Sequence, residues 1–384
     1  KNFIAGKESA HDHFFNSFNK FMPVVTDYRP QLLADIIKRA ANQNELYLEI
    51  MVLPDNANST GFADFIQKAP NWHEKQRILL NNQAFQKNIE KTITESQRIL
   101  KDAHHILNCE KKADSKACSL EVKFQYYLLR EQPFTNLFAQ AVNAFEAASR
   151  SPDIVGINLV QAEDGIISLR DYKKHMRLLE FLHQLYPKVH IALHAGELSP
   201  TSVVPENLRF HINDAVFIGH AERIGHGVDI AYEDNASELL RYMAKKPVPV
   251  EINLISNQII LNVSGKAHPL RDYLAHQVPV VLSTDDEGVL RTDLTRQYVE
   301  AALIHKLDYE AIKGINRNAL TYSFLPGDSI WANAQQQKPV KACQTLDSKA
   351  CRQLIKNSKK ATLQWKLEQQ LLQFEQTFNN RNND

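Results

Sequence analysis

Short apolar runs alternate with amphipathic stretches along most of the chain. Helical periodicity covers Pro30–Asn42, Asn136–Ala148, Lys173–Tyr186 and Ala236–Lys245. The runs themselves, rich in β-branched and other apolar residues, are predicted as strands at Ser9–Phe14, Tyr47–Val52, Val122–Leu129, Ile154–Val160, Val189–His194, Arg223–His226, Val248–Asn253 and Val278–Thr284. Alternating strands and helices imply parallel pairing, and eight such units favour a closed barrel. We predict an α/β fold in which residues 1–384 form a single (β/α)8 TIM-type barrel domain.

An open, doubly wound sheet is the alternative arrangement for such a pattern. Folds of that kind normally carry a glycine-rich turn after the first strand, where a nucleotide phosphate binds. The sequence has no such turn after Ser9–Phe14. The barrel is therefore the favoured architecture.

Two segments do not fit the regular alternation. Residues 54–119 are longer than an ordinary crossover, are rich in polar side chains and include a helical stretch at Asn88–Ile106, so they predict a helical insertion after the second strand, lying over the barrel mouth. Residues 339–384 predict a C-terminal helical extension. We expect its apolar stripe to pack on the barrel rather than to bind a partner; the stripe consists of Leu363, Trp365, Leu367, Leu371 and Phe374.

The charges of the chain are almost balanced. Forty-five Lys and Arg residues face forty-four Asp and Glu residues, so no overall field is available to attract nucleic acid or an anionic membrane. Apolar runs of about eighteen residues, the length that a spanning helix needs, are also missing. A small ligand of low charge is the partner that this composition favours. The oligomeric state stays open.

Four cysteines bear on the cellular compartment. Cys109 and Cys118 lie in one polar stretch, and Cys343 and Cys351 lie in another. Two close, even pairs predict the disulfides Cys109–Cys118 and Cys343–Cys351, which persist in oxidising compartments. We therefore expect a secreted or periplasmic protein whose signal peptide has been removed. Four free thiols in a cytoplasmic protein are the alternative.

Histidines and a glutamate occur at the ends of two predicted strands. His11 and His13 end the first strand, and residues two apart on a strand project to the same face. His194 ends another strand, and the carboxyl ends of barrel strands converge on one face, where His194 would meet the first pair. Glu197 follows His194 closely and is placed to transfer protons.

Two further motifs occupy strand ends. His226 stands between Gly225 and Gly227, where the backbone can turn tightly beside a pocket. Asp285 and Asp286 follow the apolar run Val278–Leu282, and adjacent carboxylates there are costly to desolvate unless a cation compensates them. Three histidines and one aspartate with a free position for water describe a catalytic zinc site, which makes hydroxide available near neutral pH.

These four motifs, in this order, resemble those of the adenosine deaminase family, and the surrounding sequence looks like its secreted branch, the adenosine-deaminase-related growth factors. The resemblance extends from about His11 to Gly288, with further matches at Tyr47-Leu-Glu-Ile, Val155-Gly-Ile-Asn-Leu and His268-Pro-Leu. It implies that one Zn²⁺ is bound by His11, His13, His194 and Asp285. It also implies that Glu197 protonates the purine nitrogen N1, while His226 and Asp286 orient and activate the attacking water.

The sequence departs from the family pattern in two places. Phe15 stands where many members have an acidic residue that contacts the ribose, and Gln161 stands where a purine-contacting glycine is common. The candidates for contacting substrate here are Phe15, Asn16, Gln161, Glu163 and Asp164.

The activity implied by the resemblance is hydrolysis of adenosine or 2′-deoxyadenosine to inosine or 2′-deoxyinosine with release of ammonia. Adenine or a modified nucleoside is an alternative substrate, because Phe15 leaves recognition of the sugar unassigned. Adenylate is disfavoured, since no basic cluster adjoins the motifs. A binuclear amidohydrolase site would commonly need a lysine that Ile154–Val160 lacks. A secreted binding protein that uses the barrel as a scaffold is the non-enzymatic alternative.

Overall fold

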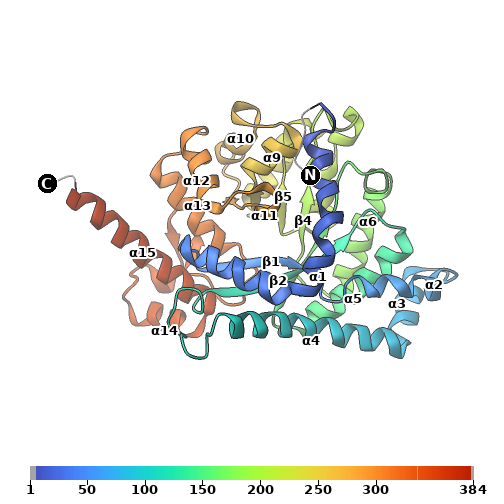
Figure 1. The fold of residues 1–384 in the computed structure, drawn as a ribbon. Coiled ribbons are helices and arrows are strands. Elements are labelled where there is room, and N and C mark those ends of the chain that lie inside the picture. The colour runs from blue at the N-terminus through green and yellow to red at the C-terminus, as the bar shows by residue number, and fades with distance from the viewer. Residues whose placement is uncertain (1–5, 335, 382–384) are drawn as a thin grey trace.

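Seven parallel strands form the core of the computed structural model, which describes residues 6–334 and 336–381 (Figure 1). In chain order the strands are β1 (Tyr47–Val52), β2 (Glu121–Leu129), β3 (Ile154–Val160), β4 (Ala192–Ala195), β5 (Arg223–His226), β6 (Val250–Ile252) and β7 (Val280–Leu282). Within each of two sheets, β1–β3 and β4–β7, every strand pairs in parallel with the next one along the chain. A single parallel bridge between Ile157 and Ile191 joins the β1–β3 sheet to the β4–β7 sheet.

The predicted α/β barrel architecture is confirmed by this strand order and by the solved structures described below, although the barrel is open. Within residues 6–334 and 336–381, no strand lies between β7 and β1 to close the ring. The other seven strand predictions correspond to β1–β7. The observed β4, β6 and β7 are shorter than their predicted runs chiefly because the first two or three residues of each run lie outside the paired ladder.

The predicted strand at Ser9–Phe14 is wrong, because this segment begins the long helix α1 (Ala10–Asn42). The side chain of Ser9 caps the helix by accepting a hydrogen bond from the backbone N–H of Asp12 at 2.9 Å, and Asp12 places a negative charge in the first turn. Phe14 then meets Phe18 one turn later, with ring centroids 5.4 Å apart. Capping and side-chain spacing of this kind stabilise a helix rather than a strand.

Helix α1 links the two edges of the barrel. Phe14 packs with Val228, Ile260 and Leu261, which follow the carboxyl ends of β5 and β6, and the last turn of α1 leads into β1. Helix α1 therefore runs as a crossover helix does, from the carboxyl edge back to the amino edge.

Helices surround the sheets on the outside. Among them, α5 (Phe134–Arg150) packs on β2 and β3, and α13 (Tyr309–Thr321) packs on β7. The remaining helices of the barrel region are α6 (Ile166–Leu185), α7 (His211–Phe217), α8 (Ala236–Lys245), α9 (Leu254–Leu261), α10 (Leu270–Ala275), α11 (Glu287–Leu290) and α12 (Leu294–Leu303), with short 3₁₀ turns η2 (Pro205–Leu208), η3 (Ile230–Tyr232) and η4 (Gly265–Ala267). One apolar core joins the inner faces of the helices to the strands, from Leu53 to Ile315.

The segment between β1 and β2 is largely helical. It contains η1 (Asn58–Phe62), α2 (Ala63–Ile66), α3 (Trp72–Asn81) and α4 (Gln83–Ile106). Helix α4 packs against α1 and α5, so it adds an outer layer on the flank of the barrel (Figure 1). The predicted disulfide Cys109–Cys118 follows α4 and is present.

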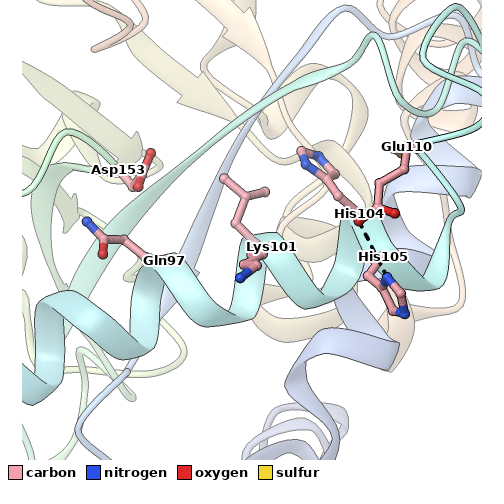
Figure 2. Close-up of a pocket in the computed structure, with 8 residues that line it drawn as sticks. Gln97, Lys101, His104, His105, Glu110 and Asp153 are labelled. Atoms are coloured by element: carbon pink, nitrogen blue, oxygen red, sulfur yellow. Dashed lines mark ion pairs between the residues drawn. The ribbon is translucent and has the colours of Figure 1, made fainter.

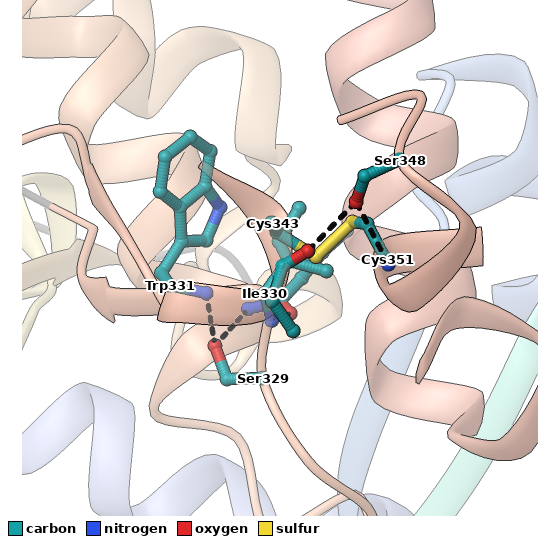
Figure 3. The surroundings of a disulfide bond; sticks show 8 residues. Ser329, Ile330, Trp331, Cys343, Ser348 and Cys351 are labelled. Atoms are coloured by element: carbon teal, nitrogen blue, oxygen red, sulfur yellow. Dashed lines mark hydrogen bonds between the residues drawn. A yellow bond between two sulfur atoms is a disulfide. The ribbon is translucent and has the colours of Figure 1, made fainter. Parts of the chain in front are cut away.

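The C-terminal segment packs as a small unit with a core of its own. It contains β8 (Trp331–Asn333), β9 (Lys338–Pro339), η5 (Lys341–Cys343), α14 (Lys349–Asn357) and α15 (Lys359–Arg381). The predicted disulfide Cys343–Cys351 is present, and it lies in this core beside Ile330 and Trp331 (Figure 3). Ser348 begins α14 there by accepting from the backbone N–H of Cys351 at 3.1 Å.

The apolar stripe of α15 packs most tightly on the barrel at its start, and it still reaches Tyr309 of α13 through Phe374, with ring centroids 5.9 Å apart. Leu363 is buried with Leu320 and Leu325, whereas the side chain of Phe374 is 52% exposed. No helix in the described ranges combines the length and the apolar character needed to cross a bilayer.

Candidate active site

Two strand ends and one loop bring together three side chains that carry potential metal-ligand atoms. His194 stands near the end of β4, His226 ends β5, and Asp285 lies three residues after β7. One potential ligand atom from each lies within 4.8 Å of the other two. The parallel register explains this meeting, because β4 pairs with β5 and Ala195 is opposite His226.

The backbone at this cluster adopts conformations that most residues avoid. His226 has φ of 69° and Asp285 has φ of 56°, both in the left-handed region. Gly196 has φ of 73°, and a Cβ atom there would lie 2.4 Å from a carboxylate oxygen of Asp229. Gly196 adopts this conformation without strain, whereas the strain at His226 and Asp285 is typical of a functional site.

His194 is fixed for metal binding by Asn158 on β3. The ring nitrogen Nδ1 of His194 lies 2.9 Å from Oδ1 of Asn158, and the backbone N–H of His194 donates to the same oxygen at 3.1 Å. Since an amide oxygen only accepts, Nδ1 carries the proton and Nε2 keeps its lone pair. Burial lowers the pKa of His194 to about 4, so the ring is neutral, as a metal ligand requires.

Two adjacent carboxylates complete the negative side of the cluster. Asp285 accepts a hydrogen bond from the hydroxyl of Ser256 at 2.6 Å. Burial, and then the charge of Asp285, raise the pKa of Asp286 well above its usual value. A cation between these side chains would relieve that repulsion, which agrees with the sequence prediction for Asp285 and Asp286.

Glu197 lies beside the cluster with its carboxylate Oε1 3.6 Å from Nδ1 of His226. The side chain of Glu197 is nearly completely buried. Burial, followed by the charges of Asp285 and Glu163, raises its pKa well above the usual value, which favours the protonated form that a general acid needs.

Both oxygens of Glu163, a predicted substrate contact, are used inside the protein. Oε1 accepts from the backbone N–H of Gly196 at 3.0 Å and lies 2.6 Å from Nδ1 of His211, and Oε2 accepts from the backbone N–H of Glu197 at 2.8 Å. Burial alone would raise its pKa, yet the hydrogen bond and charge of His211 bring that pKa down to about 2. Glu163 therefore holds the loop that carries Glu197.

The predicted meeting of His11 and His13 with His194 is not found. On a helix, residues two apart project in different directions, and here Nε2 of His11 lies 3.1 Å from Asp164 while Nδ1 of His13 lies 2.6 Å from Glu8. The cluster consists of His194, His226 and Asp285, without either N-terminal histidine. Ligation by His11 and His13 stays a prediction.

The other predicted substrate contacts differ in their surroundings. Phe15 is half-buried against the ring of His11, at 4.8 Å between centroids, whereas Asn16 is exposed. Gln161 accepts from the backbone N–H of Glu131 at 2.8 Å, so its side chain is tied to a neighbouring loop. Asp164 is engaged by His11 at the carboxyl edge of β3. Their contact with a substrate is not tested by this arrangement.

Several residues that support the cluster were missed in the sequence. Asn158 is a polar amide inside the apolar run Ile154–Val160, and this is the signal for its role. Ser256 and Asn257 lie on α9, whose position over the site depends on the tertiary fold. His268 stood in a matching motif to which no role was assigned.

A separate cavity lies away from the strand ends. It is open, has a volume of about 340 Å³ and adjoins α4 and the disulfide Cys109–Cys118 (Figure 2). Its lining residues are Gln97, Leu100, Lys101, His104, His105, Cys109, Glu110 and Asp153, none of which was predicted as a ligand or catalytic residue. The strand-end cluster is thus the place where the predicted chemistry converges.

A parallel α/β barrel with a His–His–Asp cluster at the carboxyl ends of its strands defines a candidate metal-dependent enzyme of the barrel class, because barrel enzymes carry their active sites at this edge. Within that class the chain belongs to the adenosine deaminase family. The family model described as Adenosine deaminase matches residues 5–332.

The comparisons with individual proteins agree with this assignment. An adenosine deaminase of Klebsiella pneumoniae (strain 342) is 39% identical over 137 residues, which is 35% of this chain and 38% of that protein. The N6-methyl-AMP deaminase of Arabidopsis thaliana superposes with a TM-score of 0.57 at 20% identity, over 84% of this chain and 80% of its own. An amidohydrolase from Burkholderia ambifaria with bound Zn superposes with a TM-score of 0.50 at 17% identity, over 78% and 69% of the two chains.

Proposed function

We propose that this protein is a zinc-dependent deaminase that hydrolyses adenosine or 2′-deoxyadenosine to inosine or 2′-deoxyinosine and ammonia. The observation that carries the proposal is the cluster of His194, His226 and Asp285 beside the buried Glu197. Membership of the adenosine deaminase family supports it. The matched stretch spans only about two-fifths of the curated relatives' length, so their activity is carried to this chain as a proposal.

The donor chemistry of the cluster fits a zinc ion. His194 offers a free imidazole Nε2, and Asp285 offers a carboxylate oxygen, both of them ligands that zinc accepts. These two side chains would hold the ion, with His226 and Asp286 next to it. A zinc ion there would make hydroxide available near neutral pH.

The residues of the chain would supply proton transfer and orientation. Glu197, kept protonated by its surroundings, would give its proton to N1 of the purine while hydroxide adds to C6. Ammonia then leaves C6 and the hydroxyl oxygen stays, so that one water is consumed for each ammonia released. Glu163 would keep Glu197 in place through the backbone N–H groups of Gly196 and Glu197.

The test is turnover of a substrate panel by protein whose zinc content is measured on the same sample. We expect the adenosine absorbance band to decline with release of ammonia, faster for adenosine and 2′-deoxyadenosine than for adenine. Zinc-loaded protein without turnover of any aminopurine would contradict the proposal.

A second candidate is a deaminase of another 6-aminopurine. Phe15, which lies against His11 where many relatives have an acidic residue, favours it. Faster turnover of adenine or of an N6-substituted nucleoside than of adenosine would support this candidate. The two disulfides support the further proposal that the protein works in an oxidising compartment, as a secreted or periplasmic protein does.

A further inference from the structure

His226 is connected to a buried chain of hydrogen bonds that begins at the backbone. The N–H of Leu270, at the start of α10, donates to Nδ1 of His268 at 3.1 Å. Nε2 of His268 lies 2.9 Å from Oδ1 of Asn257, and Nδ2 of Asn257 lies 2.8 Å from Nδ1 of His226. Asn257, His268 and His226 are all nearly or completely buried, so water does not compete for these groups.

The direction of each bond follows from the first one. A backbone N–H can only donate, so Nδ1 of His268 accepts and carries no proton. The proton of the His268 ring is then on Nε2 and is donated to Oδ1 of Asn257. This orients the Asn257 amide, whose Nδ2 group donates to Nδ1 of His226. Burial lowers the pKa of His268 to about 3, in keeping with a neutral ring that has one proton.

The lone pair of His226 Nδ1 is therefore occupied. Two other groups approach the ring without offering a better bond: Oε1 of Glu197 at 3.6 Å from Nδ1, and Nδ2 of Asn253 at 3.5 Å from Nδ1 and 3.4 Å from Nε2. With Nδ1 accepting, the single ring proton of His226 is on Nε2.

We propose that Asn257 and His268 are positioning residues that hold His226 in the tautomer protonated at Nε2, so that His226 serves as a hydrogen-bond donor in the deamination and neither as a base nor as a metal ligand. The proposal rests on the proposed function for the reaction itself. It assigns a role to the His268-Pro-Leu motif, and it leaves proton acceptance from water to a carboxylate of the Asp285–Asp286 pair.

The first experiment observes the tautomer directly and needs no activity. Protein labelled with ¹⁵N at histidine is examined by NMR, and the His226 ring signals are identified by their loss in His226→Gln. We expect Nδ1 of His226 at the unprotonated position and Nε2 at the protonated position. A protonated Nδ1 in the wild-type protein would overturn the proposal.

The second experiment reverses donor and acceptor in the last bond of the hydrogen-bond relay, which runs from His268 through Asn257 to His226. In Asn257→Asp the carboxylate can only accept, so we expect the His226 proton to move to Nδ1 and kcat to fall on the order of 100-fold, with a smaller change in KM and with zinc retained. Asn262→Asp, an exposed position that ends the same helix, is the matched control and should keep wild-type signals and rates. Unchanged His226 signals in folded Asn257→Asp would contradict the relay.

The third experiment uses rescue at His268. Gln offers an N–H group in place of His268 Nε2–H, so His268→Gln should preserve the Nε2 tautomer and most of the turnover, whereas His268→Leu should give a mixture of both tautomers of His226. Equal behaviour of the two variants would argue against positioning by His268. If the wild-type protein shows the expected tautomer but no turnover, the proposed function fails and the relay stands.

Discussion

Of two pairs of histidines in this chain, one pair meets in the fold and the other does not. His194 and His226 lie at the ends of adjacent parallel strands, and the register of β4 and β5 brings their rings to 5.2 Å between centroids. His11 and His13 are two apart in sequence, yet they lie on α1 and engage different partners, Asp164 and Glu8. Closeness in sequence thus says little about convergence, whereas position at the end of a parallel strand fixes it.

The loss of His194 is the change with the largest expected effect. His194→Ala removes the imidazole that Asn158 orients, so we expect turnover to fall by on the order of 10⁴-fold or more together with the loss of bound zinc. His276→Ala, an exposed histidine elsewhere on the barrel, serves as the control. Full zinc content in folded His194→Ala would show that the metal is bound somewhere else.

Substitution of Glu197, the proposed general acid, is expected to lower turnover without loss of bound zinc. Glu197→Gln keeps the size of the side chain but removes the proton that N1 would receive, so turnover should fall by on the order of 1,000-fold. Zinc content should stay at the wild-type level, as it should in the exposed control Glu238→Gln. Turnover close to wild type would exclude Glu197 as the acid.

Glu163, which holds the loop that carries Glu197, gives a prediction for stability. The folded pKa of Glu163, about 2, lies below its ordinary value of 4.5, so its contribution to stability is complete above pH 4.5 and is lost as the pH falls toward 2. Glu163→Gln should therefore reduce the free energy of unfolding by about 3 kcal/mol at neutral pH.

Denaturant unfolding from pH 7 to pH 3 measures this effect. The difference between wild type and Glu163→Gln should shrink as the pH falls, while the exposed control Glu206→Gln should match the wild type throughout. A difference that is independent of pH would mean that the charge of Glu163 does not stabilise the loop.

The smallest effect is expected at the N-terminal histidines. With α1 folded as described, His11→Ala and His13→Ala should keep their zinc and change turnover by less than about tenfold, as judged by metal analysis and initial rates. Loss of zinc equal to that of His194→Ala would restore the ligand role predicted from the sequence, and would require the first turn of α1 to rearrange.

The sequence was sufficient to predict a site residue wherever that residue stands at the end of a recognisable apolar strand. His194, His226 and Asp285 follow apolar runs, and parallel pairing then determines where they meet. The prediction of a strand at Ser9–Phe14 failed because Ser9 and Asp12 form a helix cap, a local signal that the apolar pattern concealed. The roles of Asn158 and Asn257 depend on which elements become neighbours, and that information is not local.

Anomalous diffraction at the zinc edge, from crystals of the zinc-loaded protein, would locate the ion that we propose to bind between His194 and Asp285. We predict one strong peak at about 2.0–2.2 Å from a nitrogen of His194 and from an oxygen of Asp285. A fully loaded crystal with no peak at these residues, or with its peak at another site, would rule out this zinc site.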